Sequence, residues 1–334
     1  MSKVRKAKNI KKVVWAVDPL AEEPKYQKHV LKTLEGFTKG YRCQVLPAYV
    51  VSPPNPYLPA KGLKEFYEGT RGAVGGAWKK LVAGTSFASI SGPEVLIQNK
   101  FSTQKSVQAL LKYANAQDAD LVAASTHARS GLPRSILGSF AETLVMQSKM
   151  PTLVINPRAN WRSKVSRILF PTDLSHGAWD VFPDVVNLAK RLGAKIILYH
   201  KVDLLNEYSG PVLKNMPMYR DLLNEDLERR QTLMKQFEAL SAKQGVITET
   251  VLNQGTEYVA DAVISCMKKT KPCLIAMASQ TGPVASALLG SVTRQVFRSA
   301  DCPVWVLHPE QKGSKTMAQF ENWALNASYL SGLR

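Results

Sequence analysis

Two stretches of the chain combine small, hydroxyl-bearing and glycine residues in a way that suits the binding of a phosphate. They cover residues 125–139 and 278–291, and each ends in Gly-Ser directly before a segment with helical periodicity. A Gly-Ser pair at the start of a helix gathers unpaired backbone N–H groups and a hydroxyl around one point, which favours an anion. The alternative is structural, because Ser139 and Ser291 would also serve as helix N-caps without any anion.

The two stretches differ in charge. Arg129 and Arg134 lie in the first, whereas no Lys or Arg lies between Pro272 and Val292 around the second. His127 also belongs to the first stretch, but a loop histidine without a carboxylate partner is more often a hydrogen-bonding residue than a general base. The first stretch is therefore the stronger candidate for a phosphate site.

Other kinds of chemistry find little support in the residue pattern. Ser175 and His176 follow Asp173, but adjacent residues in one loop seldom reach the geometry of a catalytic triad. His200 and His308 lack the spacing of zinc ligands, and the loops differ from the phosphate loop of P-loop NTPases. We assign no catalytic residue and no metal ligand. Slow ATP hydrolysis is an alternative for which the sequence offers no mechanism.

The candidate stretches occupy corresponding places in a chain that repeats itself at an offset of about 152 to 155 residues. Residues 13–18 correspond to residues 168–173, and residues 150–157 correspond to residues 302–309. Both opening runs are apolar and end at an aspartate, as expected of a buried parallel strand with a polar residue at its carboxyl end. The pattern indicates a tandem duplication.

Apolar runs and helical periodicities alternate within the second half. Gly193 and Gly245 each follow a helical segment, which is typical of a helix C-cap. Such alternation predicts an α/β fold, with two tandem Rossmann-like α/β sandwich domains that each hold an open, mainly parallel, five-stranded sheet. Ligands of such sheets bind outside the carboxyl ends of the strands. The expected strands are 168–173, 195–202, 246–252, 273–278 and 303–307, and the expected helices are 179–192, 219–244, 258–269 and 291–299.

The first half follows the same order with one interruption, at residues 52–95. A proline-rich stretch at 53–59 and the later Gly72, Gly75 and Gly76 break the periodicity there. We predict an extended loop in this segment, which would cover the first site as a lid or fill it as a plug. The expected organisation is a basic arm at 1–12, domains at 13–157 and 166–309, a linker at 158–165 and an amphipathic tail at 310–334.

The charge of the chain is strongly positive and unevenly distributed. The 334 residues carry a net charge of +18, and residues 1–160 hold 23 of the 44 basic but only 10 of the 26 acidic residues. Such a surplus attracts nucleic acid or other anions. No aromatic-basic interleaving and no recognisable DNA-reading helix accompanies the basic arm, so a solvated arm is favoured over nucleic-acid binding.

The cysteine count and the lengths of the apolar runs bear on the compartment. Cys43, Cys266, Cys273 and Cys302 are too few for a disulfide framework, and the apolar run at residues 13–17 is too short for a signal-peptide core. No stretch approaches the roughly 20 apolar residues of a membrane span. We expect a cytoplasmic protein that does not bind a membrane.

The order of these features resembles the universal stress protein family, present twice in tandem. The resemblance covers residues 10–157 and 165–309. Its marks are an apolar strand that ends in Asp, a strand that ends in Val, a small-residue loop that leads to Gly-Ser, and a final Pro-Val-x-Val-type strand. It implies the fold of that family and a stress-response regulatory module rather than an enzyme. The implied ligand is ATP or another adenine nucleotide, with Mg²⁺.

The resemblance also implies site residues. Asp18 and Asp173 would lie beside adenine, and Val50 and Val202 would contact it. Family members that bind ATP use a Gly-x-x-Gly-x9-Gly-Ser/Thr loop, whose first two glycines are replaced here in both halves, so that each added Cβ narrows the site. The remaining positions are Ser125, His127, Ala128, Arg129, Gly138 and Ser139 in the first half, and Ala278, Thr281, Gly290 and Ser291 in the second.

Family dimers associate through their last strands, so the resemblance implies that residues 152–155 pair antiparallel with residues 304–307. The two domains would then form a pseudo-dimer within one chain. A further homodimer and a protein partner are also expected. The alternative function is a nucleotide-free scaffold or partner-binding stress protein that acts through its basic surface and its C-terminal tail.

Overall fold

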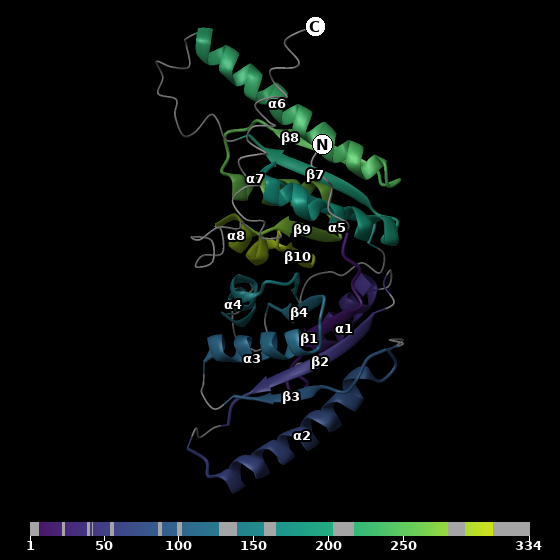
Figure 1. Cartoon of the computed structure of the whole chain (residues 1–334), viewed down its shortest axis with the longest axis vertical. Coiled ribbons are helices and arrows are strands. Elements are labelled where there is room, and N and C mark those ends of the chain that lie inside the picture. The colour runs from purple at the N-terminus through teal and green to yellow at the C-terminus, as the bar shows by residue number, and fades with distance from the viewer. Residues whose placement is uncertain are drawn as a thin grey trace.

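The computed structural model describes most of both halves of the chain. The described residues are 7–21, 24–38, 41, 43–53, 57–85, 89–98, 102–126, 139–156, 165–202, 217–279 and 291–309. Residues 1–6 of the predicted arm, most of the linker and the tail at 310–334 lie outside them. One twisted sheet runs the length of the molecule, with helix α2 at one end and helix α6 at the other (Figure 1).

Each half alternates strands and helices. The first half consists of β1 (Lys12–Ala16), α1 (Pro24–Thr38), β2 (Gln44–Val51), α2 (Ala60–Val82), β3 (Glu94–Ile97), α3 (Thr103–Ala116), β4 (Leu121–Ser125), α4 (Ser139–Gln147) and β5 (Thr152–Ile155). The second consists of β6 (Arg167–Pro171), α5 (His176–Leu192), β7 (Lys195–Lys201), α6 (Pro217–Ala242), β8 (Thr248–Asn253), α7 (Val259–Thr270), β9 (Leu274–Ala278), α8 (Ser291–Ser299) and β10 (Val304–Leu307). All the strands and helices predicted for the second half are present, with small shifts at their ends.

Local signals in the sequence explain several of these boundaries. Ser175 caps α5, since its Oγ accepts a hydrogen bond from the N–H of Ala178 at 3.2 Å. Gly193 ends the same helix with φ at 62°, in the left-handed region that glycine adopts without strain. Gly245, which follows α6, has φ at 74°. The prediction of two glycine-terminated helices is confirmed.

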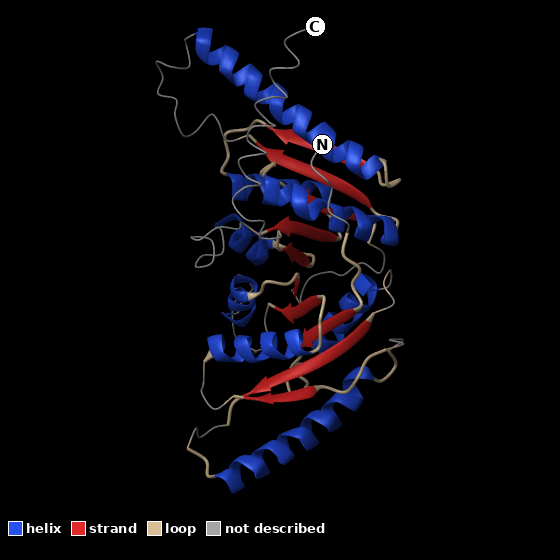
Figure 2. Cartoon of the chain, viewed as in Figure 1, coloured by secondary structure: helices blue, strands red, loops and turns tan. Residues whose placement is uncertain are grey.

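Over the part of the chain that the structure describes, the sheet has ten strands in the order β3-β2-β1-β4-β5-β10-β9-β6-β7-β8. Neighbouring strands within each half are parallel (Figure 2). In contrast, β5 and β10 are antiparallel, with Trp305 opposite Leu153. The expected pairing of residues 152–155 with residues 304–307 is therefore present. It removes two edges that would otherwise be open to other strands.

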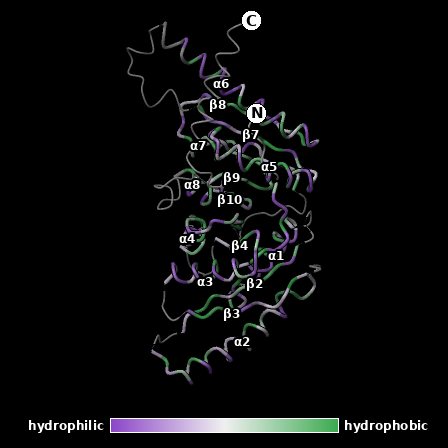
Figure 3. Tube along the Cα trace, in the orientation of Figure 1, coloured by the Kyte–Doolittle hydropathy of each residue, from purple (hydrophilic) through white to green (hydrophobic). Residues whose placement is uncertain are grey.

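Helices cover both faces of the sheet and share cores across the two halves. One cluster of buried residues joins α1 and α2 to α5 and α6, and another joins α4 to α7 and α8. Phe37 of α1 meets Trp305 of β10 edge-on, with ring centroids 5.6 Å apart. The strands are accordingly the most hydrophobic part of the trace (Figure 3).

The prediction of an extended loop at residues 52–95 is wrong, because α2 occupies residues 60–82. The prolines precede this helix, and its glycine-rich face is largely exposed. Val74, Trp78 and Leu81 recur at helical spacing and are buried, and Trp78 contacts Trp15 with centroids 6.0 Å apart. Burial of this stripe outweighs the cost of about 1 kcal/mol per glycine.

The described part of the basic arm is bound to the opposite half of the molecule. The backbone N–H of Lys8 donates to the Asp184 carboxylate of α5 at 2.7 Å, although 176 residues separate the two. Arg191 of α5 donates to the Asn9 side chain at 3.0 Å and stacks on the Tyr41 ring at 4.7 Å. Lys8 and Asn9 are exposed, as the solvated-arm prediction expects, but both are hydrogen-bonded to α5.

The cysteines are all free thiols, and Cys266, Cys273 and Cys302 are buried. Burial raises the pKa of the Cys302 thiol far above its usual range. Among the helices that the structure describes, none is both long enough and apolar enough to span a membrane.

Candidate functional site

The strand register brings three predicted residues of the first half to one edge of the sheet. Ala16 of β1 is paired with Ala48 of β2 and with Ala124 of β4. Two residues further along, Asp18 is therefore level with Val50 and with Thr126. This is the carboxyl edge, where open α/β sheets bind their ligands.

The three positions at this edge differ in chemistry. Asp18 is half-buried, and its Oδ1 accepts a hydrogen bond from the N–H of Leu20 at 3.1 Å. Val50 is also half-buried and packs against the apolar cluster beneath α3 and α4. Ser125 ends β4, and the N–H of the next residue, Thr126, donates to the carbonyl of Ile155 at 2.9 Å. A carboxylate acceptor thus lies level with an apolar side chain.

The predicted phosphate loop of the first half is fixed at both its ends. Ser125 lies at the carboxyl end of β4, and Ser139 is the exposed first residue of α4. The N-terminus of α4 therefore follows directly on the loop, as an anion site requires. The predicted residues between these two serines lie outside the described residues: His127, Ala128, Arg129, Arg134 and Gly138.

The second half has a corresponding edge. Pro171 of β6 is paired with Tyr199, and Leu169 is paired with Ile275 of β9. The N–H of Thr172 donates to the carbonyl of Tyr199 at 2.8 Å, so the register with β7 continues past Pro171 and sets Asp173 level with Lys201. The carboxylate of Asp173 is exposed and accepts a hydrogen bond from the N–H of Ser175 at 2.9 Å, at the start of α5.

The loop of the second half also begins and ends at described residues. Ala278, which ends β9, is opposite Leu307, as Ser125 is opposite Ile155. The two predicted loop starts are therefore equivalent in register. Ser291 is the first residue of α8, while Thr281 and Gly290 lie outside the described residues.

Val202 is not the structural counterpart of Val50. Val50 is level with Asp18, but the residue level with Asp173 is Lys201, and Val202 follows one position later. Successive side chains of a strand point to opposite faces, so Val202 and Val50 face different layers of helices. The two valines therefore differ by one position in register, although both lie near the end of the second strand of their half, and their contact with adenine stays a prediction.

Lys201 is held in place by the backbone around it. Its side chain is 6% exposed, and its Nζ donates to the carbonyl of Val202 at 3.0 Å and to the carbonyl of Gly255. Asn253, which ends β8, accepts a hydrogen bond from the N–H of Gly255 at 2.7 Å and donates to Glu257 at 2.8 Å. A side chain at Gly255 would overlap the Glu257 carboxylate. The turn after β8 is therefore shaped around this ammonium group.

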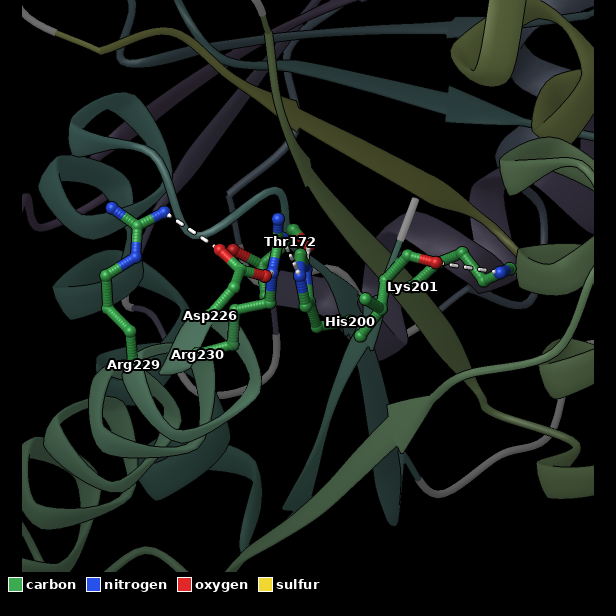
Figure 4. A network of polar contacts seen from close by, with 7 residues as sticks. Thr172, His200, Lys201, Asp226, Arg229 and Arg230 are labelled. Carbon is green, nitrogen blue, oxygen red and sulfur yellow. Dashed lines mark hydrogen bonds and ion pairs between the residues drawn. The ribbon is translucent and has the colours of Figure 1, made fainter. Parts of the chain in front are cut away.

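The other face of β7 carries a second polar network, built on His200. Its Nδ1 lies 2.7 Å from the carbonyl oxygen of Thr172, and its Nε2 lies 2.7 Å from Nη1 of Arg230 on α6 (Figure 4). Arg230 also donates from Nε to the Asp226 carboxylate. The sequence gives no sign of this network, since His200 and Arg230 are 30 residues apart and belong to no motif.

A serine and a histidine meet at the end of the second half. Ser279 Oγ lies 2.9 Å from His308 Nδ1, just beyond β9 and β10. Burial lowers the pKa of His308 to about 4, which makes its imidazole a weak base. No local pattern in the sequence indicates this pair, which the register of Ala278 with Leu307 in adjacent strands brings together. We assign it no catalytic role.

Metal-binding groups were sought over the same described ranges. No three His, Cys, Asp or Glu side chains within them are close enough together to hold a metal ion.

Comparison with known proteins accounts for this arrangement. The sequence model of the universal stress protein family matches residues 9–156 and, a second time, residues 164–308. The chain belongs to the universal stress protein family. Because the family model matches twice, the chain is a tandem member with two family domains.

Known relatives agree with this assignment. A universal stress protein of Methanocaldococcus jannaschii is 27% identical over 155 residues, which are 46% of this chain and 88% of the relative. A solved universal stress protein from Archaeoglobus fulgidus superposes with a TM-score of 0.61 at 18% identity, over 90% of this chain and 97% of its own. A protein of unknown function from Pseudomonas aeruginosa gives 0.57 at 14% identity, over 95% and 98%. Both structures share the fold of this tandem universal stress protein.

Proposed function

We propose that this tandem universal stress protein is a stress-response regulatory module whose first half binds ATP or another adenine nucleotide. The single observation that carries the proposal is the level arrangement of Asp18 and Val50 at the carboxyl edge of the first half. A carboxylate accepts a hydrogen bond from the exocyclic amino group of adenine, while an apolar side chain packs on the ring.

The phosphates of the nucleotide would lie at the other side of this edge. Ser125 and Ser139 bracket a loop that leads directly into α4, whose first N–H groups favour an anion. Mg²⁺ would accompany the phosphates rather than occupy a cage of protein ligands, as is usual for nucleotide sites.

The second half does not fit an adenine base in the same way. Lys201 takes the place that Val50 has in the first half, and its ammonium group is bound to two carbonyl oxygens. An ammonium offers only donors and cannot accept from the adenine amino group. Moving Lys201 aside would leave the buried carbonyl of Val202 without its donor, at a cost of about 1–3 kcal/mol, and would also remove the donor of the half-buried Gly255 carbonyl. We therefore expect one nucleotide per chain.

The proposal is tested by titrating nucleotide-stripped full-length protein with Mg-ATP in a calorimeter, which gives affinity and stoichiometry. The expected stoichiometry is one. Asp18→Ala should weaken binding at least tenfold, which corresponds to about 1.4 kcal/mol, the size of one lost hydrogen bond to a charged group. Asp173→Ala is the matched control in the second half and should bind as the wild type does.

Three outcomes would contradict the proposal. A stoichiometry of two would mean that the second half binds despite Lys201. Loss of binding in Asp173→Ala with retention in Asp18→Ala would move the site to the second half. No heat up to millimolar Mg-ATP would favour the alternative of a nucleotide-free partner-binding protein.

A further inference from the structure

His200 is buried between the end of β6 and the middle of α6. Its side chain is 3% exposed, and each of its ring nitrogens has one polar neighbour. Nδ1 faces the Thr172 carbonyl oxygen and Nε2 faces the Arg230 guanidinium, each at 2.7 Å (Figure 4). This ring is therefore a polar link between the sheet and α6, and Ser241 with Thr248 forms another near the C-terminal end of the helix.

The two neighbours fix the protonation state of the ring. A carbonyl oxygen only accepts, so Nδ1 must carry a hydrogen, and a guanidinium only donates, so Nε2 must present its lone pair. His200 is therefore neutral in this structure, with its hydrogen on Nδ1. A second proton would sit on Nε2 and point at the N–H of Arg230, which would place two donors and two positive charges in contact.

We propose that His200 and Arg230 form a pH-sensitive latch, which holds the N-terminal half of α6 on the sheet when His200 is neutral and releases it when His200 is protonated. The proposal does not depend on nucleotide binding, because the latch lies on the opposite face of β7 from Lys201.

The surrounding charges determine how readily the ring takes up a proton. Burial is the largest effect and lowers the pKa of His200, and the Arg230 charge lowers it further. The Thr172 carbonyl and the carboxylates of Asp173 and Asp226 act in the opposite direction but do not outweigh burial. Arg229 also faces this group and donates to Asp226 at 3.3 Å.

The position of Arg230 along α6 makes the release local. Met234, Phe237 and Ser241, which follow it, are buried and anchor the C-terminal half of the helix in the core. Before Arg230, the described side chains from residue 221 to residue 229 are all exposed or half-buried. Among the described side chains of α6, Arg230 is the first that a hydrogen bond joins to the sheet, so we expect its loss to loosen residues 217–230.

The size of the effect follows from linkage. If the latched form excludes the second proton and the released form binds it with the ordinary pKa of about 6.5, the opening equilibrium rises up to about 30-fold between pH 7.5 and pH 5. Opening is favoured as the pH falls, because only the released form takes up the proton.

Hydrogen exchange of the full-length protein tests the latch. After correction for intrinsic exchange, amides of residues 217–230 should exchange up to about 30-fold faster at pH 5 than at pH 7.5, while amides near Phe237 should change little. His200→Gln should abolish this pH dependence, because an amide can donate to Thr172, accept from Arg230 and never be protonated in this range. His29→Gln is the matched control, since His29 is a half-buried histidine of α1 whose pKa is also lowered.

The latch is overturned if residues 217–230 exchange equally at both pH values, or if His200→Gln keeps the wild-type pH dependence. A second measurement follows the ring itself. In ¹⁵N-histidine NMR spectra of the wild type, the imidazole whose signals are absent from His200→Gln should show the Nδ1–H form at pH 7.5 and a midpoint below 6.5. A midpoint of 6.5 or above for that imidazole would also overturn the latch.

Discussion

Val50 and Lys201 occupy the same place in the two halves, each level with the aspartate that follows the first strand. The fold is duplicated, yet the chemistry at this point is not. The first half has an apolar side chain at this position and the second half has a buried cation, although both positions lie at the carboxyl edge of parallel strands.

Exchange of this residue between the halves tests its importance. Val50→Lys should abolish Mg-ATP binding in the first half, because the lysine side chain would occupy the space of the adenine ring. The first half is not expected to offer a turn such as the one after β8 that binds the Lys201 ammonium group. Val50→Met, which keeps an apolar side chain, is the control and should lower affinity less than tenfold. Calorimetry measures both, and tight binding by Val50→Lys would contradict the assignment of the site.

The contact of the Lys8 backbone with Asp184 predicts that substitutions of these two residues have different effects on the free energy of unfolding. Asp184→Ala should lower the free energy of unfolding by about 1–3 kcal/mol, because the half-buried N–H of Lys8 loses its charged acceptor. Lys8→Ala should change it by less than about 0.5 kcal/mol, because the donor is the backbone and not the lysine side chain. Urea denaturation of the two variants decides, and equal effects would count against this contact.

The exposed glycine face of α2 predicts a gain in stability. A Cβ at Gly76 would meet no other heavy atom within 4 Å, so Gly76→Ala should raise the free energy of unfolding by about 0.5–1 kcal/mol. Gly245→Ala is the contrasting variant and should destabilise the protein, because φ there is 74°. Thermal unfolding followed by circular dichroism compares the two, and a loss of stability in Gly76→Ala would argue against a helix at this position.

The pKa of His308 predicts a pH dependence of stability. Its value of about 4 in the folded chain lies below the ordinary 6.5, so the folded form binds the proton less well and stability falls as the pH drops from 6.5 towards 4. The loss reaches about 3 kcal/mol at pH 4. His308→Asn should remove this part of the pH dependence, because asparagine does not titrate. Asparagine is chosen because Asn156 is the matching residue of the first half. Urea denaturation at pH 7 and pH 4 measures the free energy of unfolding of both proteins. The prediction is wrong if the wild type and the variant lose the same stability between the two pH values.

Much of the fold could be predicted from the sequence because its signals are local. Apolar runs that end in Asp, and helices that end at Gly193 and Gly245, place the elements of the second half within a few residues. The helix α2 could not be predicted in this way, since its glycines oppose a helix and only the contact of Trp78 with Trp15 explains it.

The candidate site was predictable only in part. The aspartates and the ends of both loops follow from the repeat, and the register then places them at one edge. Lys201 was missed because Val202 next to it matches the pattern and only strand register separates the two. The contacts of His200 with Arg230 and of Ser279 with His308 depend on tertiary neighbours that no local pattern indicates.

The antiparallel junction of β5 and β10 also bears on the biogenesis of the protein. When the ribosome has completed only the first half, the strand that pairs with the outer side of β5 has not yet been made. The N–H of Lys8 also lacks its acceptor, because Asp184 lies 176 residues further along the chain. A nascent or truncated first half therefore exposes the unpaired backbone N–H and C=O groups of β5, and this strand edge can pair with another copy of the same half. Because both halves belong to one polypeptide, β10 is present near β5 at a high local concentration. The fusion of the halves therefore protects β5 against pairing with strands of other molecules.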